Sequence, residues 1–239
     1  MKFLLTFALV LSAIAPIACH STGSSGSVKP APAPVALNPK ATNVGILIFD
    51  GLFITEFTAP FDVYKHVGDK MNVFTVGLTR DSIKTYEGVV LQPDYGFNEA
   101  PRIDVLVVPS GLQSTGKDLE NKDLIGFVKR NAQSAKYVTS HCWGAFTLAQ
   151  AGCLTGRECT TFPTSIDDLQ TKFPDLKTRK DSRFVVSDKF ITSNGGVAAF
   201  EAALHVVESL YGKETADKVA AGMVFAGQNR TYSMEPSIR

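Results

Sequence analysis

One cysteine of this chain stands where a nucleophile could be presented. Residues 136–142, KYVTSHC, read as a buried strand, and residues 143–152, WGAFTLAQAG, have the apolar spacing of a helix. Cys142 therefore falls on a sharp strand-to-helix turn, which imitates the nucleophile elbow G-x-S-x-G. The start of a helix also favours the thiolate over the thiol. The alternative is a small core residue, because free cysteines are often buried.

Glu56 is the second candidate for chemistry. It follows the first expected strand and has apolar neighbours such as Phe57 and Ala59. A carboxylate on an apolar face is costly to bury, so its pKa rises and it can share a proton with a nearby thiolate. The alternative is an exposed glutamate on a helix.

Two backbone N–H groups are candidates for an oxyanion hole. Gly111 ends the apolar stretch VVPSG, and a glycine there can bring its backbone N–H close to a ligand. The N–H of Trp143, directly after Cys142, would be the second donor. The alternative for Gly111 is an ordinary tight turn.

The other site candidates follow the ends of expected strands, because ligands of open parallel sheets bind beyond the carboxyl ends of the strands. We expect four residues to line or support the pocket: Asp50, Ser110, His141 and Gly195. His141 adjoins Cys142 but should face the other way, since side chains alternate along a strand. The remaining histidines are expected in the tether, on the surface or in structural positions, so no general base is identified: His20, His66 and His205.

Alternating strands and helices must position these residues. Apolar runs predict strands at 44–50, 72–79, 104–111, 136–142 and 158–162, with a strand or hairpin at 89–101 and a hairpin at 183–193. Helical spacing predicts helices at 53–68, 123–135, 143–152, 165–173, 196–212 and 213–227, with Ser165 as a helix cap. The alternation predicts an α/β, flavodoxin-like three-layer sandwich with a mostly parallel central sheet.

The N-terminal segment does not read as part of the fold. Its basic start, short apolar stretch and small residues before Cys19 are typical of an export signal. We expect a lipid-anchored or periplasmic protein with Cys19 as the lipid acceptor, and plain secretion is the alternative. The expected organisation is a signal at 1–19, a Ser/Gly/Pro/Ala tether at 20–42, one domain at 43–226 and a polar tail at 227–239.

Composition and motifs narrow the function further. The 239 residues are 44% hydrophobic with a formal net charge of +1, which fits one globular domain and gives no reason to expect a nucleic-acid partner. No metal cluster or dinucleotide motif is visible, so we expect neither a metal nor a cofactor. Cys153 and Cys159 either approach each other or remain two separate buried thiols.

Taken together, these segments resemble the ThiJ/PfpI superfamily, which has the class I glutamine amidotransferase-like fold. The resemblance spans about residues 43–226 and rests on GILIFDGLFITEFTAPFDVY, DVLVVPSG, SHCWGAFTLAQAGCLTGRECTTFP and ITSNGGVAAFEAALHVVESLYGKETADKVA. Within the superfamily, the likeness is closest to isonitrile hydratase and to the amidotransferase-like domain of AraC-type regulators.

The resemblance implies that Cys142 is the nucleophile, Glu56 its acidic partner, and Gly111 and Trp143 the oxyanion-hole positions. It also implies a homodimer that acts on a small molecule by hydratase-like or hydrolase-like chemistry, or a non-catalytic ligand-binding or redox-sensing module. Two departures stand out. Phe162 occupies a position where AraC-type relatives commonly have histidine, and Trp143 replaces a small hydroxyl residue, which should narrow or reshape the pocket.

Overall fold

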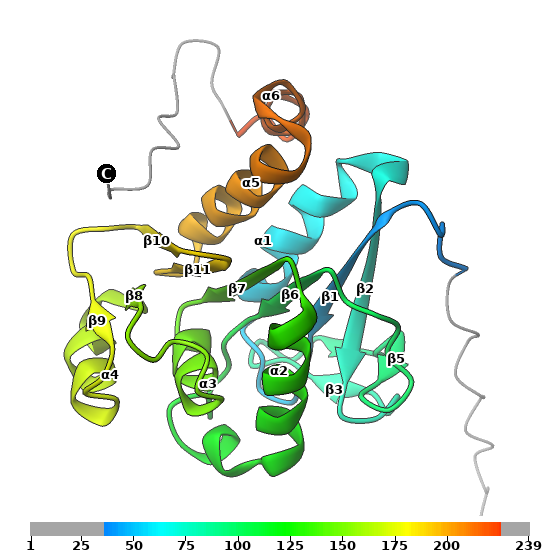
Figure 1. The fold of residues 1–239 in the computed structure, drawn as a ribbon. Coiled ribbons are helices and arrows are strands. Elements are labelled where there is room, and N and C mark those ends of the chain that lie inside the picture. The colour runs from blue at the N-terminus through cyan, green and yellow to red at the C-terminus, as the bar shows by residue number, and fades with distance from the viewer. Residues whose placement is uncertain (1–35, 226–239) are drawn as a thin grey trace, which may run out of the picture. The chain divides into compact units, whose positions relative to one another are not determined.

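The computed structural model describes residues 36–225, which Figure 1 draws in colour. Residues 1–35 and 226–239 lie outside the described part of the chain. The expected signal at 1–19, the lipid acceptor Cys19, most of the tether and the polar tail therefore stay predictions. None of the helices within residues 36–225 is long and apolar enough to cross a membrane.

Seven strands form the main sheet: β1 (Thr42–Leu47), β2 (Met71–Gly77), β5 (Tyr95–Gly96), β6 (Val105–Val108), β7 (Tyr137–His141), β10 (Phe184–Ser187) and β11 (Phe190–Ser193). Two small ladders join β3 (Ile83–Lys84) to β4 (Val90–Leu91) and β8 (Glu158–Cys159) to β9 (Lys177–Thr178). The α-helices are α1 (Ile54–Lys65), α2 (Lys122–Ser134), α3 (Gly144–Gln150), α4 (Ile166–Lys172), α5 (Val197–Tyr211) and α6 (Lys213–Gly222).

The strand order confirms the expected fold class. The main sheet runs β10-β11-β7-β6-β1-β2-β5, and only the β10–β11 pair is antiparallel. The five longer parallel strands thus follow the flavodoxin-like order, in which the sequence of strands reverses between β1 and β6. This places the loops after β1, β6 and β7 at one edge of the sheet, where the candidate site residues lie.

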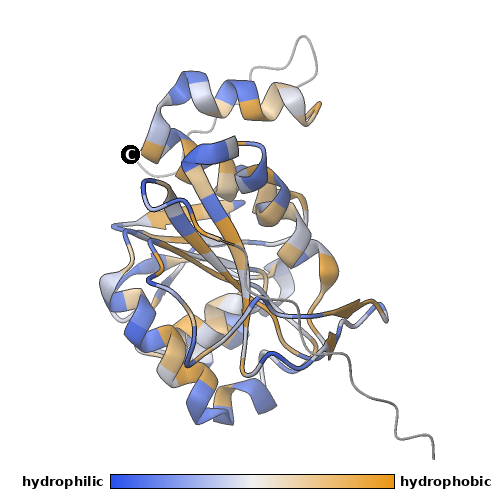
Figure 2. Cartoon of the chain, turned by 90° about the vertical axis from the view of Figure 1, so that its right-hand side faces the viewer, coloured by the Kyte–Doolittle hydropathy of each residue, from blue (hydrophilic) through white to orange (hydrophobic). Residues whose placement is uncertain are grey.

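Two hydrophobic cores lie on opposite faces of this sheet. One combines sheet residues with α2 and α3, and the other with α1, α5 and α6 (Figure 1). Figure 2 shows the apolar strands between helices whose polar residues form stripes. Because both faces are covered, the central strands read as continuous apolar runs, such as the buried residues 44–47 of β1.

The folded part begins earlier than the tether boundary at residue 42 suggests. Leu37 packs against the α2–α3 core, and the Asn38 backbone N–H donates to Asn72 Oδ1 at 3.0 Å. The Asn38 side chain in turn donates to the carbonyl of Asp69 at 3.1 Å. Leu37 and the backbone and side-chain hydrogen bonds of Asn38 therefore attach the end of the expected tether to the domain.

The segment at 89–101 is less regular than expected. It contains only β4, which pairs with β3 in a small hairpin, and β5, which pairs with β2 at the sheet edge. Asp94 lies between them, and its carboxylate accepts hydrogen bonds from the Thr75 N–H at 2.7 Å and the Thr75 hydroxyl at 2.8 Å. These side-chain bonds take the place of a longer ladder.

The cysteines outside the elbow do not form a disulfide. Cys153 and Cys159 are both free thiols. Cys159 is fully buried in the α2–α3 core, whereas Cys153 is partly buried at its margin. The structure therefore shows two free thiols, of which only Cys159 is fully buried as expected.

Gly144, the first residue of α3, allows that helix to approach strand β6. A Cβ at this position would lie 2.9 Å from the Pro109 carbonyl oxygen and would overlap the Val108 carbonyl oxygen. Backbone atoms cannot move aside as the end of a long side chain can. The close fit of elbow and strand therefore depends on the absence of a side chain at Gly144.

We expect Gly144→Ala to lower the free energy of unfolding by about 2–3 kcal/mol, the usual cost of forcing extra volume into a packed site. Urea denaturation followed by circular dichroism measures this change. Gly126→Ala is the matched control, because Gly126 lies inside α2 and its Cβ would meet only the end of the Arg130 side chain at 3.2 Å. The control should be neutral or slightly stabilising. Equal effects of the two changes would contradict the close-packing argument.

Candidate active site

Cys142 lies on a strained turn between β7 and α3. Its φ is 52°, in the left-handed region that non-glycine residues rarely adopt. Two hydrogen bonds hold this conformation: the Cys142 N–H donates to the Ser193 carbonyl at 3.0 Å, and the Thr161 hydroxyl donates to the Cys142 carbonyl at 2.8 Å. Only 7% of Cys142 is exposed. The turn thus has the geometry of a nucleophile elbow, with a thiol that is largely removed from solvent.

Glu56 reaches the same place from the first turns of α1. It is only 6% exposed, and its Oε1 accepts a 2.9 Å hydrogen bond from the Gly196 N–H. Its Oε2 is buried without a hydrogen-bond partner. The start of α1 is held in turn by the Glu87 carboxylate, which accepts from the Ile54 N–H at 3.1 Å. A buried carboxyl oxygen with no partner is a strong candidate for proton exchange.

Gly195 shows how close the thiol and the carboxyl group are. A Cβ on Gly195 would lie 2.5 Å from Cys142 Cβ, 2.7 Å from Glu56 Oε1 and 2.9 Å from Glu56 Oε2. The φ of Gly195 is 87°, a conformation that also favours glycine. Cys142 and Glu56, 86 positions apart in the sequence, therefore border the same glycine.

Burial changes the proton affinities of both groups. Loss of solvent raises the pKa of Glu56 from 4.5 to about 7, although the Gly196 N–H opposes the shift. Burial, and secondly the charge of Glu56, raise the pKa of Cys142 to about 11, against smaller opposing effects of Ser110 and the Trp143 N–H. The expectation that the helix start favours a thiolate is therefore corrected, because desolvation and a neighbouring carboxylate outweigh it.

The backbone N–H groups of Trp143 and Gly111, the two candidates for the oxyanion hole, differ in which group they already face. The Trp143 N–H points at the Cys142 sulfur and lowers the pKa of the thiol. The Gly111 N–H instead donates to the Ser114 hydroxyl at 2.9 Å, and that hydroxyl lies 3.3 Å from Asp118 Oδ2. The expected free N–H at Gly111 is thus not present, because a turn brings the buried Ser114 hydroxyl back onto it.

The supporting residues lie around this pair in different ways. Ser110 is fully buried with a hydroxyl that lacks a hydrogen-bond partner, and it lies close enough to the Cys142 thiol to lower the pKa of that thiol. Asp50 accepts the Lys84 N–H at 2.9 Å and so ties the β3–β4 hairpin to the loop after β1. His141 faces the α1–α5 side of the sheet, where its Nδ1 lies 2.9 Å from the Ser193 hydroxyl oxygen.

An aromatic wall of four rings borders the elbow: Tyr86, Phe53, Trp143 and Phe162. The Phe53 ring lies 5.2 Å from that of Tyr86 and 5.8 Å from that of Trp143, which lies 6.1 Å from that of Phe162. The indole is anchored because Trp143 Nε1 donates to the Ser165 hydroxyl at 2.9 Å. Ser165 was expected to cap α4, yet its side chain makes no capping bond and holds the indole instead.

Thr161 and Ser114 were not identified from the sequence, whereas Ser193 and Gly196 belong to a run at an expected strand end whose individual roles were not assigned. Thr161 and Ser193 hold the elbow, Gly196 binds Glu56, and Ser114 occupies the Gly111 N–H. Only the run 193–196, Ser-Asn-Gly-Gly after an apolar strand, offered a sequence signal. In residues 36–225 there is no group of three or more His, Cys, Asp or Glu side chains that could hold a metal ion.

We expect Glu56→Gln to speed alkylation of Cys142 by iodoacetamide about tenfold above pH 8, because it removes a neighbouring negative charge worth roughly one pKa unit at the thiol. Below pH 6 the two rates should converge, since Glu56 is mostly protonated there when its pKa is about 7. Mass spectrometry of the peptide containing Cys142 follows the reaction across the pH range.

Glu87→Gln is the matched control for this measurement, because Glu87 is exposed and contacts the start of the same helix. Its alkylation profile should follow that of the wild type. A Glu56→Gln rate equal to or below the wild-type rate at pH 8 would show that the carboxylate does not act on the thiol.

Comparisons with known proteins agree with this geometry. The chain matches the DJ-1/PfpI family over residues 42–209. It is 30% identical over 187 residues to isonitrile hydratase of Pseudomonas putida, covering 78% of this chain and 79% of that protein. It is 32% identical over 191 residues to protein DJ-1alpha of Drosophila melanogaster, covering 77% of this chain and 85% of that protein.

The fold is shared with solved structures as well. The crystal structure of Drosophila melanogaster DJ-1beta superposes with a TM-score of 0.70 and 25% identity, covering 78% of this chain and 99% of that chain. The sheet order, the elbow at Cys142 and the family match over most of the described residues lead to the same conclusion. This chain is a member of the DJ-1/PfpI family.

Proposed function

We propose that this protein is a cofactor-independent enzyme of the isonitrile hydratase type, with Cys142 as the nucleophile and Glu56 as the proton donor and acceptor. One observation carries the proposal: a strained, buried thiol and a buried carboxyl group with one unpartnered oxygen border the same glycine. The relationship to isonitrile hydratase at 30% identity supports this choice of reaction.

The pair is suited to hold one proton between its two groups. With a pKa of about 7 for Glu56 and about 11 for Cys142, the pair retains a single proton over much of the range between these values. A minor arrangement of this state places the proton on Glu56 and leaves Cys142 as the thiolate. That arrangement combines a nucleophile with an acid directly beside it.

The proposed hydration of an isonitrile balances without any further reactant. The Cys142 sulfur attacks the terminal carbon, Glu56 delivers a proton to that carbon, and a thioimidate R–N=CH–S forms. Water then adds to the carbon while the Glu56 carboxylate takes one of its protons and passes it to the nitrogen. When the carbon–sulfur bond breaks and the carbonyl forms, the remaining hydroxyl proton returns to Glu56 and the sulfur leaves as the thiolate. The products are the N-substituted formamide and the original thiol–carboxylate pair, so the only substance consumed besides the isonitrile is water.

A reactive aldehyde is the second small electrophile that this site could accept. Attack of the thiolate on the aldehyde carbon places negative charge on the oxygen, which needs a donor close to the sulfur. The Trp143 N–H is such a donor, since it already faces the Cys142 sulfur. The Gly111 N–H could take part only if the Ser114 hydroxyl moved away.

A non-catalytic redox-sensing module is the alternative of a different class. Oxidation by peroxide requires an accessible thiolate. Burial and the charge of Glu56 raise the pKa of the Cys142 thiol to about 11 and so reduce the amount of thiolate that both the enzyme and the sensor would use. The homodimer expected from the family resemblance stays a prediction.

We expect the wild type to convert at least one small electrophile in a panel of cyclohexyl isonitrile, benzyl isonitrile and methylglyoxal. Cys142→Ser should lower kcat/KM by at least about a thousandfold, because it removes the nucleophile. Glu56→Gln should also lose turnover, even though its thiol is alkylated faster, because it cannot transfer a proton. Formation of the formamide or loss of the aldehyde is followed by chromatography.

Cys153→Ser is the control, because Cys153 is a free, partly buried thiol at the margin of the α2–α3 core. Turnover that persists in Cys142→Ser, or its absence from the wild type with every substrate, would overturn the enzyme proposal. In the second case, oxidation of Cys142 at low peroxide together with an altered ligand affinity would establish the sensor instead.

Trp143 should determine which substrates reach the thiol. Phe162 and Tyr86, at the ends of the aromatic wall, are 39% and 60% exposed, so the wall offers an accessible apolar surface beside the elbow. An apolar substituent on the substrate would be desolvated against these rings. A carboxylate in the same place would lose its hydration without gaining a partner.

We therefore expect Trp143→Ala to lower kcat/KM for benzyl isonitrile about tenfold, the effect of losing one aromatic contact of roughly 1–1.5 kcal/mol. The value for methyl isonitrile should change much less, because its substituent is too small to reach the wall. Ser165→Ala tests the anchoring bond separately and should have a smaller effect in the same direction. Equal losses for both substrates would indicate damage to the elbow and not a change in selectivity.

A further inference from the structure

We propose that His141 is a positioning residue that acts through Ser193 on the glycine turn at 195–196 and so controls how Glu56 is held beside Cys142. The mechanism proposed above does not use His141. This inference concerns the same thiol–carboxyl pair, so its biological meaning rests on the proposed function. Its test, however, needs no substrate.

The first step is the contact between His141 and Ser193. His141 is fully buried on β7, and its partner in the parallel register of β11 is Ser193. The imidazole Nδ1 lies 2.9 Å from the Ser193 hydroxyl oxygen, and Nε2 lies 3.4 Å from the Thr139 hydroxyl oxygen. Burial lowers the pKa of His141 to about 3, so the ring is neutral and has one N–H donor and one nitrogen acceptor.

The second step connects Ser193 to the carboxyl group. The Ser193 hydroxyl oxygen accepts the Gly195 N–H at 3.3 Å, and the next N–H along the turn, that of Gly196, donates to Glu56 Oε1 at 2.9 Å. Both glycines have positive φ, 87° and 55°, and their carbonyls accept the Ala198 and Ala199 N–H groups at 3.1 Å where α5 begins. Three hydrogen bonds, joined through the peptide link between Gly195 and Gly196, thus connect His141 to Glu56.

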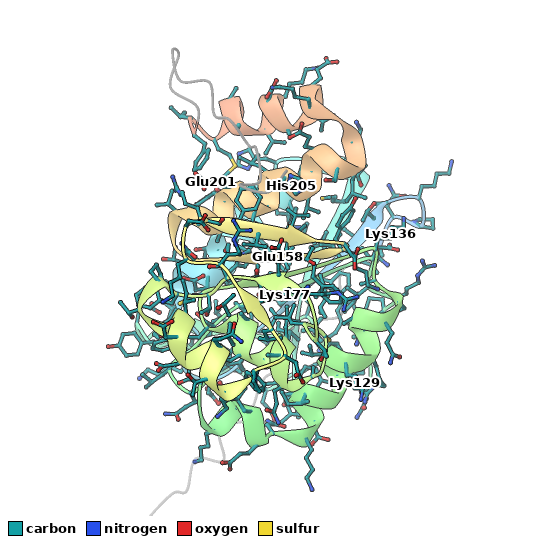
Figure 3. All side chains as sticks on the ribbon, turned by 60° about the vertical axis from the view of Figure 1, so that its left-hand side comes forward. Lys129, Lys136, Glu158, Lys177, Glu201 and His205 are labelled. Atoms are coloured by element: carbon teal, nitrogen blue, oxygen red, sulfur yellow. The ribbon has the colours of Figure 1, made fainter. Side chains whose placement is uncertain are left out.

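Other titratable groups on the packed elements are Tyr64, Glu201 and His205, and the buried Tyr64 hydroxyl has no hydrogen-bond partner. Tyr64 on α1 is buried next to Thr139, and burial raises the pKa of its phenol far above its usual range. On α5, Figure 3 shows Glu201 and His205 on the helix that follows the glycine turn. Glu201 pairs with Arg183 at 3.0 Å, while burial lowers the pKa of His205. Cys142 remains the group that shares Gly195 with Glu56.

Loss of the hydrogen bonds between His141 and the glycine turn should raise the pKa of Glu56. The Gly196 N–H stabilises the charged form of Glu56 and lowers its pKa. When the turn is released this bond weakens, so Glu56 ionises at a higher pH. Near pH 8 a larger fraction of Glu56 is then neutral, and the thiolate of Cys142 meets less repulsion. At pH 6 Glu56 is mostly protonated with or without the chain, so Cys142 should react at the same rate.

The experiment compares iodoacetamide alkylation of Cys142 at pH 6 and pH 8 in four variants. Ser193→Ala and His141→Leu should react about two to three times faster than the wild type at pH 8, the effect of one lost hydrogen bond on the ionisation of Glu56, and equally fast at pH 6. His141→Asn should restore the wild-type profile, because its amide can reach the Ser193 hydroxyl from the position of Nδ1. Ser140→Ala is the control, since its hydroxyl is buried on the same strand without a partner.

Two results would overturn the proposal. If the ratio of the alkylation rates at pH 8 and pH 6 in both Ser193→Ala and His141→Leu equals that of the wild type, the hydrogen bonds from His141 do not act on Glu56 and Cys142. A rise of equal size at pH 6 and pH 8 would show that His141 only packs the site, because loosening alone exposes the thiol at every pH. If His141→Leu does not fold, Ser193→Ala decides alone. Absence of turnover on isonitriles would overturn the proposed function but would leave this result as it stands.

Discussion

The hydrogen bond from the Gly196 N–H to Glu56 joins the parts of the site that the chain order separates. Glu56 comes from the first helix, Cys142 from the middle of the chain, and Gly196 from the turn before α5. Placing a carboxyl group out of water beside a thiol is unfavourable, and this one backbone donor is what partly offsets the loss of solvent. The part of the desolvation cost that is not offset raises the pKa of both Glu56 and Cys142. The two groups therefore retain one proton, which either of them can hold.

The parallel sheet supplies the rigid frame for that pair. Strands β6, β7 and β11 end side by side, so the loops that follow them meet at one edge. Cys142 adopts a left-handed conformation there because the Ser193 carbonyl and the Thr161 hydroxyl hold its backbone, while Gly144 lets α3 begin against β6. Strain in the elbow is thus maintained by the packing of the two cores on either side, and the reactive sulfur lies where those cores meet the loops.

Access to the sulfur and its reactivity depend on different parts of the structure. The aromatic wall contains Trp143, whose indole is fixed by Ser165, and it presents apolar surface to whatever approaches. The proton affinity of the thiol depends instead on burial and on Glu56. Because the wall uses the Trp143 side chain, whereas the thiol is affected by Glu56 and by the Trp143 backbone N–H, the substrate preference could change through the wall without changing the chemistry of the pair.

Much of this could be predicted from the sequence, because it depends on local patterns. Apolar runs alternating with helical spacing predicted the fold class, and the strand–turn–helix pattern around Cys142 predicted the elbow. Period-two alternation also predicted that His141 turns away from the thiol. What could not be predicted depends on partners distant in the chain. Ser114 occupies the Gly111 N–H, Ser165 holds an indole instead of capping a helix, and Ser193 meets His141 across 52 positions. The sign of the Cys142 pKa shift belongs to the same class, because desolvation is a property of the packed structure, whereas a helix start can be recognised in the sequence alone.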